Sequence, residues 1–276
     1  MAYNLYLSYS GRKTYLDCPL KYKFQYIDKL IVISDPKTSF FGSVIGKIFE
    51  SFYNDKLWAS PNLKTTLLEL INPTIDFYFK KEKFNDNVFR EELYQNLIKY
   101  VPIGLEIIRQ HQLLTLNSRS EIKLDIMHFD KNTGLILNLG GRADFIHGNK
   151  EDLIILDGKA SKYRDQYIDD NQLYWYALLH YLKYCVAPTK IGYLFWLFPE
   201  DPIKWIEYDE EILRKCLSDT FIIAKKILDK QFEATPSFSI CNFCKYSIRC
   251  ETGTSYLEVA KEQNNVLNSI FELEQV

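Results

Sequence analysis

Two short segments between residues 140 and 160 constrain the fold of this chain more than any other part of its 276 residues. The first, Gly140-Gly-Arg-Ala-Asp144, lies in a stretch whose polar and apolar residues alternate as they do in a strand. After a turn at 149–151, the apolar run Asp152-Leu-Ile-Ile-Leu-Asp157 leads into Gly158-Lys159. A short apolar run between turn residues indicates a buried strand. The sequence therefore predicts neighbouring antiparallel strands that each carry an aspartate.

The period-two geometry of strands decides which of these side chains can act together. Asp157 and Lys159 share one face of their strand, and adjacent strands lie about 5 Å apart, so Asp144 and Asp157 can reach one divalent ion. Mg²⁺ is commonly held by one or two carboxylates and water. A lysine beside such an ion can orient the attacking water or stabilise charge on a phosphate. The alternative is that the two aspartates only end strands and Lys159 forms a surface ion pair.

Helical and strand-like patterns alternate along the rest of the chain. Expected helices cover 8–29, 40–57, 62–115 (with breaks near 72–73 and at Pro102), 168–184 and 210–232, and expected strands cover 121–129, 135–147, 152–157, 189–198 and 203–208. This order predicts an α/β fold in which a mixed sheet is flanked by helices. We expect one domain over 1–276, with 62–115 as a helical insertion.

Composition and charge narrow the classes of function. No stretch approaches the roughly 18 apolar residues that span a bilayer, and the first residues lack the pattern of a signal peptide. We therefore expect an intracellular, cytoplasmic protein whose thiols stay reduced. A net charge of −2 excludes a global basic field. Residues 1–30 are locally basic, so Arg12 and Lys13 are candidate phosphate contacts, although most charge runs are solvated faces.

Three of the six cysteines stand close together, at Cys241, Cys244 and Cys250 in the segment 237–252. A Cys-x-x-Cys spacing suits two ligands of one metal centre, and the third cysteine then needs a partner elsewhere in the chain. Cys18, Cys185 and Cys216 are the candidates, and the last two lie in or at the end of expected helices, where buried thiols are common. Iron–sulfur, zinc and metal-free interpretations all remain open at this level.

The ordered set of motifs resembles the RecB-like branch of the PD-(D/E)XK nucleases, which includes the CRISPR-associated RecB-like exonucleases and the AddB nuclease domain. Gly141 to Asp144 matches the glycine-x-x-aspartate strand of that family, Asp157-Gly158-Lys159 matches its Asp-x-Lys, and Gln172 to Tyr176 matches its Gln-x-x-x-Tyr. The resemblance implies metal ligation by Asp144, Asp157 and the carbonyl of Gly158, and catalysis by Lys159. It also implies that Gln172 and Tyr176, one helical turn apart, line a DNA groove.

The chain departs from the family on the early helix, where many relatives carry a metal-binding histidine. The matching stretch is Gly42-Ser-Val-Ile-Gly46-Lys-Ile-Phe-Glu50, so Gly46 stands at the histidine position. Glu50 lies one turn further along the same helix face and can take over that role directly or through water. The alternative is a structural or surface carboxylate. Glu121, which opens the first expected strand, either tunes the metal environment or forms a salt bridge.

The cysteines extend the resemblance to the iron–sulfur members of the family. The stretch around Cys18-Pro19 is similar to their N-terminal cysteine segment, so Cys18, Cys241, Cys244 and Cys250 are implied ligands of a structural 4Fe–4S cluster, with zinc as the alternative. The implied activity is Mg²⁺- or Mn²⁺-dependent exonucleolytic cleavage of single-stranded DNA or DNA ends, with a helicase, recombination or CRISPR protein as partner and no membrane. The alternative is a catalytically silent DNA-binding or assembly subunit.

Overall fold

The structure is a computed structural model that describes residues 5–32, 35–165 and 168–273. The chain divides into two compact units, and each is described by itself. Unit 1 comprises residues 1–34, 129–137 and 219–276, and unit 2 comprises residues 35–128 and 138–218. In the part of the chain that the structure describes, no helix has the length and apolar character needed to cross a membrane.

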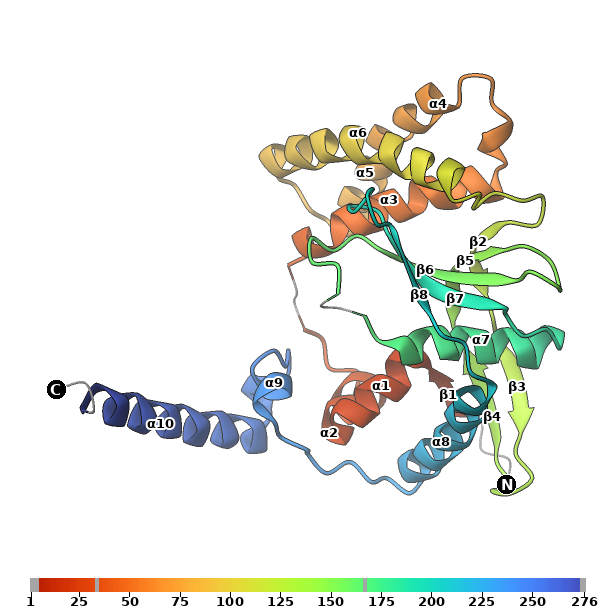
Figure 1. Cartoon of the computed structure of the whole chain (residues 1–276). Coiled ribbons are helices and arrows are strands. Elements are labelled where there is room, and N and C mark those ends of the chain that lie inside the picture. The colour runs from red at the N-terminus through yellow and green to blue at the C-terminus, as the bar shows by residue number, and fades with distance from the viewer. Residues whose placement is uncertain (1–4, 33–34, 166–167, 274–276) are drawn as a thin grey trace. The chain divides into compact units, whose positions relative to one another are not determined.

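Unit 2 is built around a five-stranded mixed sheet (Figure 1). Its strand order is β2 (Arg119–Lys123), β5 (Arg142–His147), β6 (Ile154–Lys159), β7 (Lys190–Phe195) and β8 (Ile203–Ile206). All neighbours are antiparallel except β6 and β7, which are parallel and are joined through helix α7 (Asp170–Tyr184), because parallel strands need a long crossover. The expected α/β fold and the antiparallel pairing of the two aspartate strands are therefore confirmed.

Helices cover both faces of this sheet, with α3 (Lys37–Asn54) on one side and α7 on the other (Figure 1). On the α3 side, Phe49 stacks on Trp196 with ring centroids 4.3 Å apart and nearly parallel planes. The bounds of the remaining helices on this side are α4 (Leu63–Glu69), α5 (Ile71–Lys81) and α6 (Asn87–Gln110), after the short turn Leu57–Ala59. Their apolar residues share one buried core with α3 and the sheet, so the segment 62–115 completes the core.

Pro102 does not interrupt the helix, contrary to the sequence expectation, since α6 continues through it. A proline inside a helix removes one backbone hydrogen bond and clashes with the preceding turn. Here Leu97, Val101 and Ile107, on both sides of Pro102, are almost fully buried in the core. Burial of such a face stabilises the helix by several kcal/mol, at about 1.5–3 kcal/mol per side chain, and offsets the local cost.

The three-stranded meander is a second point of difference. Each expected strand splits, 121–129 into β2 and β3 (Ile126–Phe129), and 135–147 into β4 (Ile136–Gly140) and β5. The two interruptions, near Leu124 and at Gly141, lie opposite each other, as shown by the hydrogen bond from the Leu124 N–H to the Gly141 carbonyl at 2.9 Å. The halves belong to different sheets, since β3 and β4 join β1 (Leu5–Ser8) in the order β1-β4-β3. Gly141 packs closely against α7: a Cβ there would lie 3.0 Å from Leu179 Cδ1, so that side chain would have to shift.

Unit 1 begins with β1 and the helices α1 (Tyr9–Asp17) and α2 (Pro19–Tyr22), followed by a π-helical turn over Lys23–Ile27. The single helix expected over 8–29 is thus broken at Cys18, whose backbone is extended (φ −164°, ψ 115°). The reason is Pro19, because a residue before proline is driven out of the helical region. The remaining helices are α8 (Glu210–Leu228), whose last turns belong to this unit, α9 (Phe238–Cys241), the short turn Ser247–Arg249 and α10 (Glu251–Leu273).

Candidate active site

The strand register of unit 2 brings the two aspartates together. Phe145 pairs with Leu156 across β5 and β6, so the preceding Asp144 stands opposite Asp157 on the same face of the sheet. Asp157 is almost fully buried, with 2% of its surface exposed. The backbone N–H of Gly158 donates to Asp144 Oδ2 at 2.8 Å and fixes that carboxylate against β6. The two carboxylates therefore lie next to each other, as the sequence pattern predicted.

Lys159 and Gln172 complete a connected polar network around Asp157. Lys159 Nζ lies 2.6 Å from Asp157 Oδ2 and 3.2 Å from the side-chain oxygen of Gln172. Gln172 Nε2 donates to Asp157 Oδ1 at 2.9 Å and to the Tyr176 hydroxyl at 3.0 Å. Gln172 thereby holds both the carboxylate and the lysine, a role that the sequence reasoning, which placed it only along a DNA groove, did not include.

The electrostatics of the acidic pair are unfavourable by themselves. Burial raises the pKa of Asp144 well above its usual value, and the neighbouring Asp157 carboxylate raises it further, while the Gly158 N–H opposes the shift. Burial also raises the pKa of Asp157, and the Lys159 ammonium opposes that shift. Two carboxylates that resist being charged together are an environment that a divalent cation favours, since it neutralises both. The donor set therefore fits Mg²⁺ or Mn²⁺ on chemical grounds.

Glu121 belongs to the same acidic cluster, although the sequence pattern alone gave it only a possible role near the metal. It lies on β2 between the residues that pair with Ala143 and Phe145, and its backbone adopts a positive φ of 54°, which is uncommon for a residue with a side chain. Asn54, at the end of α3, exchanges two hydrogen bonds with the backbone of the preceding Ser120 and anchors this irregular point. The charge of Glu121 also raises the pKa of Asp144.

Glu50 lies near this edge of the cluster but is already paired. Its carboxylate lies 2.8 Å from Lys47 Nζ. The pKa of Glu121 is raised mainly by burial, and the negative charge of Glu50 raises it further. Glu121 in turn lies 3.4 Å from Arg142. At Gly46, the position of the family histidine, a Cβ would meet no atom within 4 Å. Space for a larger side chain thus exists there, and the structure leaves Glu50 as a candidate rather than an assigned ligand.

Among the residues that the structure describes, no group of three or more His, Cys, Asp and Glu side chains is gathered closely enough to hold a metal ion. In the acidic site Asp144 and Asp157 face each other across β5 and β6, and Lys159 Nζ stands against Asp157. The assignment of Asp144, Asp157 and the Gly158 carbonyl as ligands therefore stays a prediction.

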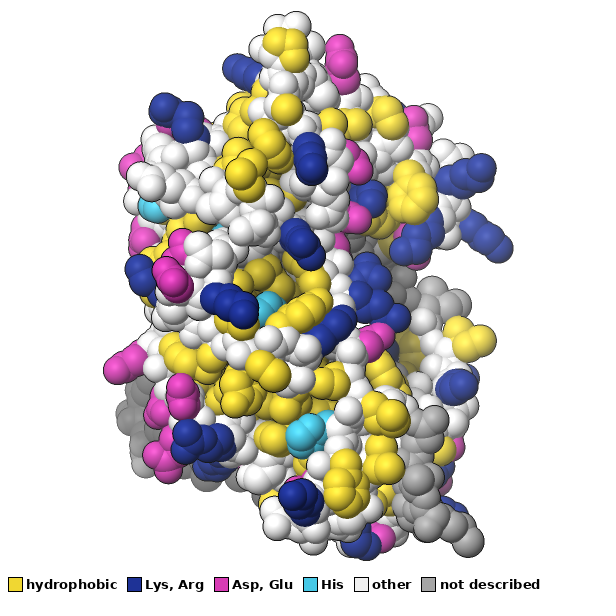
Figure 2. Space-filling model, turned by 90° about the vertical axis from the view of Figure 1, so that its right-hand side faces the viewer, with side chains coloured by type: hydrophobic (Ala, Val, Ile, Leu, Met, Phe, Trp, Pro, Cys, Tyr) yellow, Lys and Arg dark blue, Asp and Glu magenta, His cyan; other side chains and the backbone are white. Residues whose placement is uncertain are grey.

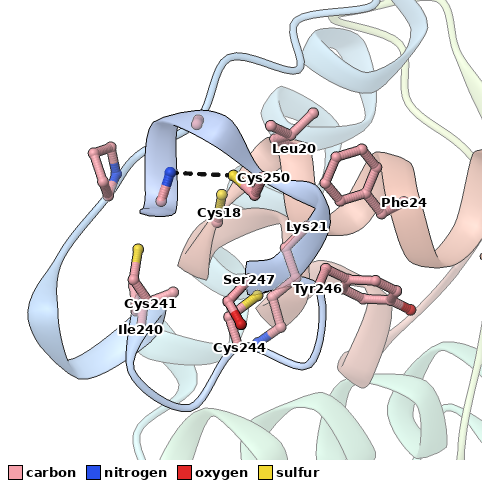
Figure 3. A pocket seen from close by; sticks show the side chains of 13 residues that line it. Cys18, Leu20, Lys21, Phe24, Ile240, Cys241, Cys244, Tyr246, Ser247 and Cys250 are labelled. Carbon is pink, nitrogen blue, oxygen red and sulfur yellow. Dashed lines mark hydrogen bonds between the residues drawn. The ribbon is translucent and has the colours of Figure 1, made fainter. Parts of the chain in front are cut away.

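The four predicted cysteines meet in unit 1. Cys18, Cys241, Cys244 and Cys250 all line one small, apolar pocket between α2 and the α9–α10 segment (Figure 3). Cys18 and Cys241 are buried, and the Gly253 N–H donates to Cys250 Sγ at 3.3 Å. A Cβ on Gly253 would lie 3.3 Å from Cys250 Sγ and 3.7 Å from Cys241 Sγ, so its absence keeps space beside the sulfurs. Among the described residues the four sulfurs share this pocket without being gathered closely enough to form a metal site, so their ligation of a cluster stays a prediction.

The other two cysteines differ from each other. Cys216 is buried in α8, as expected for a structural thiol, whereas Cys185 is exposed and the expectation of burial was wrong. Cys185 caps α7 in the left-handed conformation (φ 57°), and its N–H donates to the Tyr181 carbonyl.

The predicted basic contacts of unit 1 receive no support from their surroundings. Arg12 is buried, and its guanidinium lies 4.0 Å from Asp219. Lys13 is exposed, and its ammonium lies 3.5 Å from Asp17. On the face drawn in Figure 2, lysine and arginine side chains are interspersed with acidic and apolar ones and form no continuous basic field. Their role in DNA binding stays a prediction.

Comparison with known proteins adds a family to this geometry. The model of the PD-(D/E)XK nuclease superfamily matches residues 6–251. The chain belongs to this superfamily. The crystal structure of SSO0001 also matches, at 14% identity over 85% of this chain and 95% of that chain, with a TM-score of 0.33, which is too low to support any argument. No curated protein matches the chain.

Membership of the PD-(D/E)XK superfamily agrees with the mixed α/β fold and with nuclease activity of the metal-dependent kind that is typical of its members. It does not separate the RecB-like, iron–sulfur branch from the rest of the superfamily, and that finer prediction stays open.

Proposed function

We propose that this PD-(D/E)XK protein is a Mg²⁺- or Mn²⁺-dependent DNA nuclease whose metal is held by Asp144, Asp157 and the Gly158 carbonyl. The observation that carries the proposal is the pair of facing carboxylates, buried at Asp157 and half-buried at Asp144. Ion-pair and hydrogen-bond contacts of 2.6–3.2 Å join Asp157, Lys159 and Gln172. A buried acidic pair is costly unless a cation or a proton neutralises it. Its position where strands β5 and β6 meet α7 gives that cost a functional explanation.

The residues of the chain have distinct tasks in this proposal. A divalent cation at the pair would supply a water of lowered pKa and charge stabilisation at the phosphate. Lys159 carries its positive charge beside Asp157, where it stabilises the negative charge that develops on the scissile phosphate or orients the attacking water. Gln172 holds the Lys159 and Asp157 side chains in position. Together with Tyr176, it is proposed to contact the DNA strand that is cut. Glu121 adds negative charge at the same point, and Glu50 is the candidate that replaces the family histidine.

The four cysteines are proposed to hold a 4Fe–4S cluster with a structural role. The centre ties the N-terminal segment at Cys18 to the segment 237–252, closing a loop of more than two hundred residues, and such long closures constrain the unfolded chain most in the entropic model. Anaerobically purified protein should absorb near 400 nm and contain iron. One mole of zinc per mole of protein and no iron would establish the zinc alternative instead.

The cleavage test uses single-stranded DNA labelled at one end, with Mg²⁺ or Mn²⁺ titrated against EDTA. Wild type should cleave only with metal, and Asp157→Asn should not. Asp125→Asn is the matched control, because Asp125 lies outside the site and pairs with Lys123 at 2.8 Å. Equal, low activity of wild type and Asp157→Asn in every metal would overturn the enzyme proposal. Circular single-stranded DNA, which offers no end, should resist cleavage if the enzyme is an exonuclease.

The second candidate is a catalytically silent DNA-binding or assembly subunit, and the glycine at position 46 favours it. DNA binding without cleavage across both metals, unchanged in Asp144→Ala, would establish this function. A helicase, recombination or CRISPR protein partner is a further proposal that rests on the family resemblance. An intracellular setting is proposed from the sequence pattern of the chain.

A further inference from the structure

A short loop, residues 161–165, leaves the sheet directly after Lys159. The Lys159 carbonyl still accepts a hydrogen bond from the Trp196 N–H at 3.1 Å, so the strand is held up to this residue. Gly42 of α3 packs against the next residue, since a Cβ on it would lie 3.5 Å from Ala160 Cβ. Four residues of chain span at most about 14 Å, so residue 163 lies within that distance of Lys159 along the backbone.

The back of the loop is firmly anchored to unit 2. Arg164 donates to the Asp201 carbonyl at 3.1 Å, pairs with the Asp201 carboxylate at 2.7 Å, and stands 5.0 Å above the Phe195 ring. The next residue, Asp165, accepts from Lys204 Nζ at 2.9 Å. The ion pairs of Arg164 and Asp165, together with the cation–π contact of Arg164, hold this end of the loop against Asp201, Phe195 and Lys204.

The side chains at the front of the loop are exposed. Lys162 is exposed and has no ion-pair partner among the described residues, and 59% of the Tyr163 surface is exposed. The Tyr163 N–H donates to Ser161 Oγ at 3.0 Å, which fixes the backbone of the turn while the ring points to solvent. A single exposed aromatic residue is ordinary on a protein surface. An exposed aromatic ring beside an exposed ammonium, within four residues of Lys159, is less ordinary, because the two groups together are those that bind unpaired nucleotides.

We propose that Lys162 and Tyr163 form a contact for a single-stranded nucleic acid at the entrance to the acidic site. The Tyr163 ring stacks on an unpaired base, and the Lys162 ammonium binds a neighbouring phosphate. In a duplex the faces of the bases are covered by their neighbours, so a stacking contact selects unpaired strands without reading sequence. This inference rests on the proposed nuclease function and deepens it, since it gives the site a structural preference for single strands.

The test measures binding rather than cleavage, by fluorescence anisotropy in EDTA. One probe is a labelled oligothymidylate, and the other is an abasic oligomer of equal length that keeps the phosphates and lacks the bases. Tyr163→Ala should weaken binding of oligothymidylate about tenfold, while Tyr163→Phe keeps it and binding of the abasic probe is unchanged. Lys162→Ala should weaken both probes alike and lower the salt dependence by about one ion.

Tyr181→Ala is the matched control. This tyrosine is also exposed, but it lies nine positions beyond Gln172 on α7, about 13 Å along the axis and on the opposite face of the helix. Its removal should leave both probes bound as in wild type.

The inference is overturned if Tyr163→Ala binds oligothymidylate like wild type, if it weakens both probes equally, or if wild type binds neither probe. These outcomes are separate from those of the cleavage assay. Wild type that discriminates the probes through Tyr163 but cleaves nothing with Mn²⁺ would overturn the nuclease proposal and keep the loop contact. If wild type cleaves and Tyr163→Ala binds both probes like wild type, the nuclease proposal is kept and the loop contact is overturned.

Discussion

Replacing Asp144 by asparagine should make the metal-free protein more stable and cleavage by the holoprotein undetectable. The pKa of Asp144 is raised in the folded chain, first by burial and then by Asp157. An asparagine keeps an oxygen that accepts from the Gly158 N–H and removes the like charge. Relief of an uncompensated buried group of this kind is expected to add about 2 kcal/mol to the free energy of unfolding at pH 8. For a domain of this size that corresponds to a Tm about 4–8 °C higher.

The gain should depend on pH with a defined sign. Because the pKa of Asp144 is higher in the folded than in the unfolded chain, the contribution of Asp144 to wild-type stability is fully present below the unfolded value of about 3.9 and is lost as pH rises through the folded value. The difference between Asp144→Asn and wild type is therefore small at acid pH and grows toward pH 8. Thermal unfolding followed by circular dichroism in EDTA, at several pH values, measures it.

A control variant and an experiment with added metal test whether the gain in stability comes from the acidic pair. Asp125→Asn, in an exposed ion pair, should show no such pH-dependent gain. Added Mn²⁺ should raise the Tm of wild type and leave that of Asp144→Asn unchanged, since a ligand that binds only the folded state stabilises it. A gain independent of pH, or a variant less stable than wild type at pH 8, would refute the electrostatic reasoning.

Other variants test separate parts of the molecule. Gln172→Ala removes the hydrogen bond to Asp157 and should lower the single-turnover cleavage rate about 10–100-fold. Gly104→Ala would place a Cβ 2.5 Å from the ring of Phe49 and should cost about 1–3 kcal/mol of stability in denaturant unfolding, with cleavage chemistry retained at low temperature. Gly253→Ala should lower the iron content and the absorbance near 400 nm of anaerobically purified protein, because its methyl group enters the space beside the cysteine sulfurs.

The parts of the fold that sequence predicted well are those set by local patterns. The apolar run ending at Asp157 and the alternation through Asp144 predicted adjacent strands, and β5 and β6 pair as expected. The rule that proline ends a helix held at Pro19 and failed at Pro102. Pro19 ends the helix at Cys18, whereas Pro102 is carried inside α6 by a buried face that no local rule contains.

The parts that sequence could not predict depend on contacts between distant segments. The strained backbone of Glu121 is fixed by Asn54, which is 67 positions away in the chain, and nothing in either local pattern indicates that contact. The double role of Gln172 likewise arises only when α7 packs on the strand that carries Asp157. The anchor of Arg164 on Asp201 depends in the same way on the turn between β7 and β8.

Calorimetric titration of Mn²⁺, set beside the Mn²⁺ dependence of single-turnover cleavage, tests the central claim most directly. If Asp144 and Asp157 form the catalytic metal site, the dissociation constant for Mn²⁺ agrees with the concentration that gives half-maximal rate, and Asp157→Asn loses both binding and cleavage. Cleavage that persists in Asp157→Asn, or wild-type cleavage that does not depend on Mn²⁺ occupancy, would contradict it.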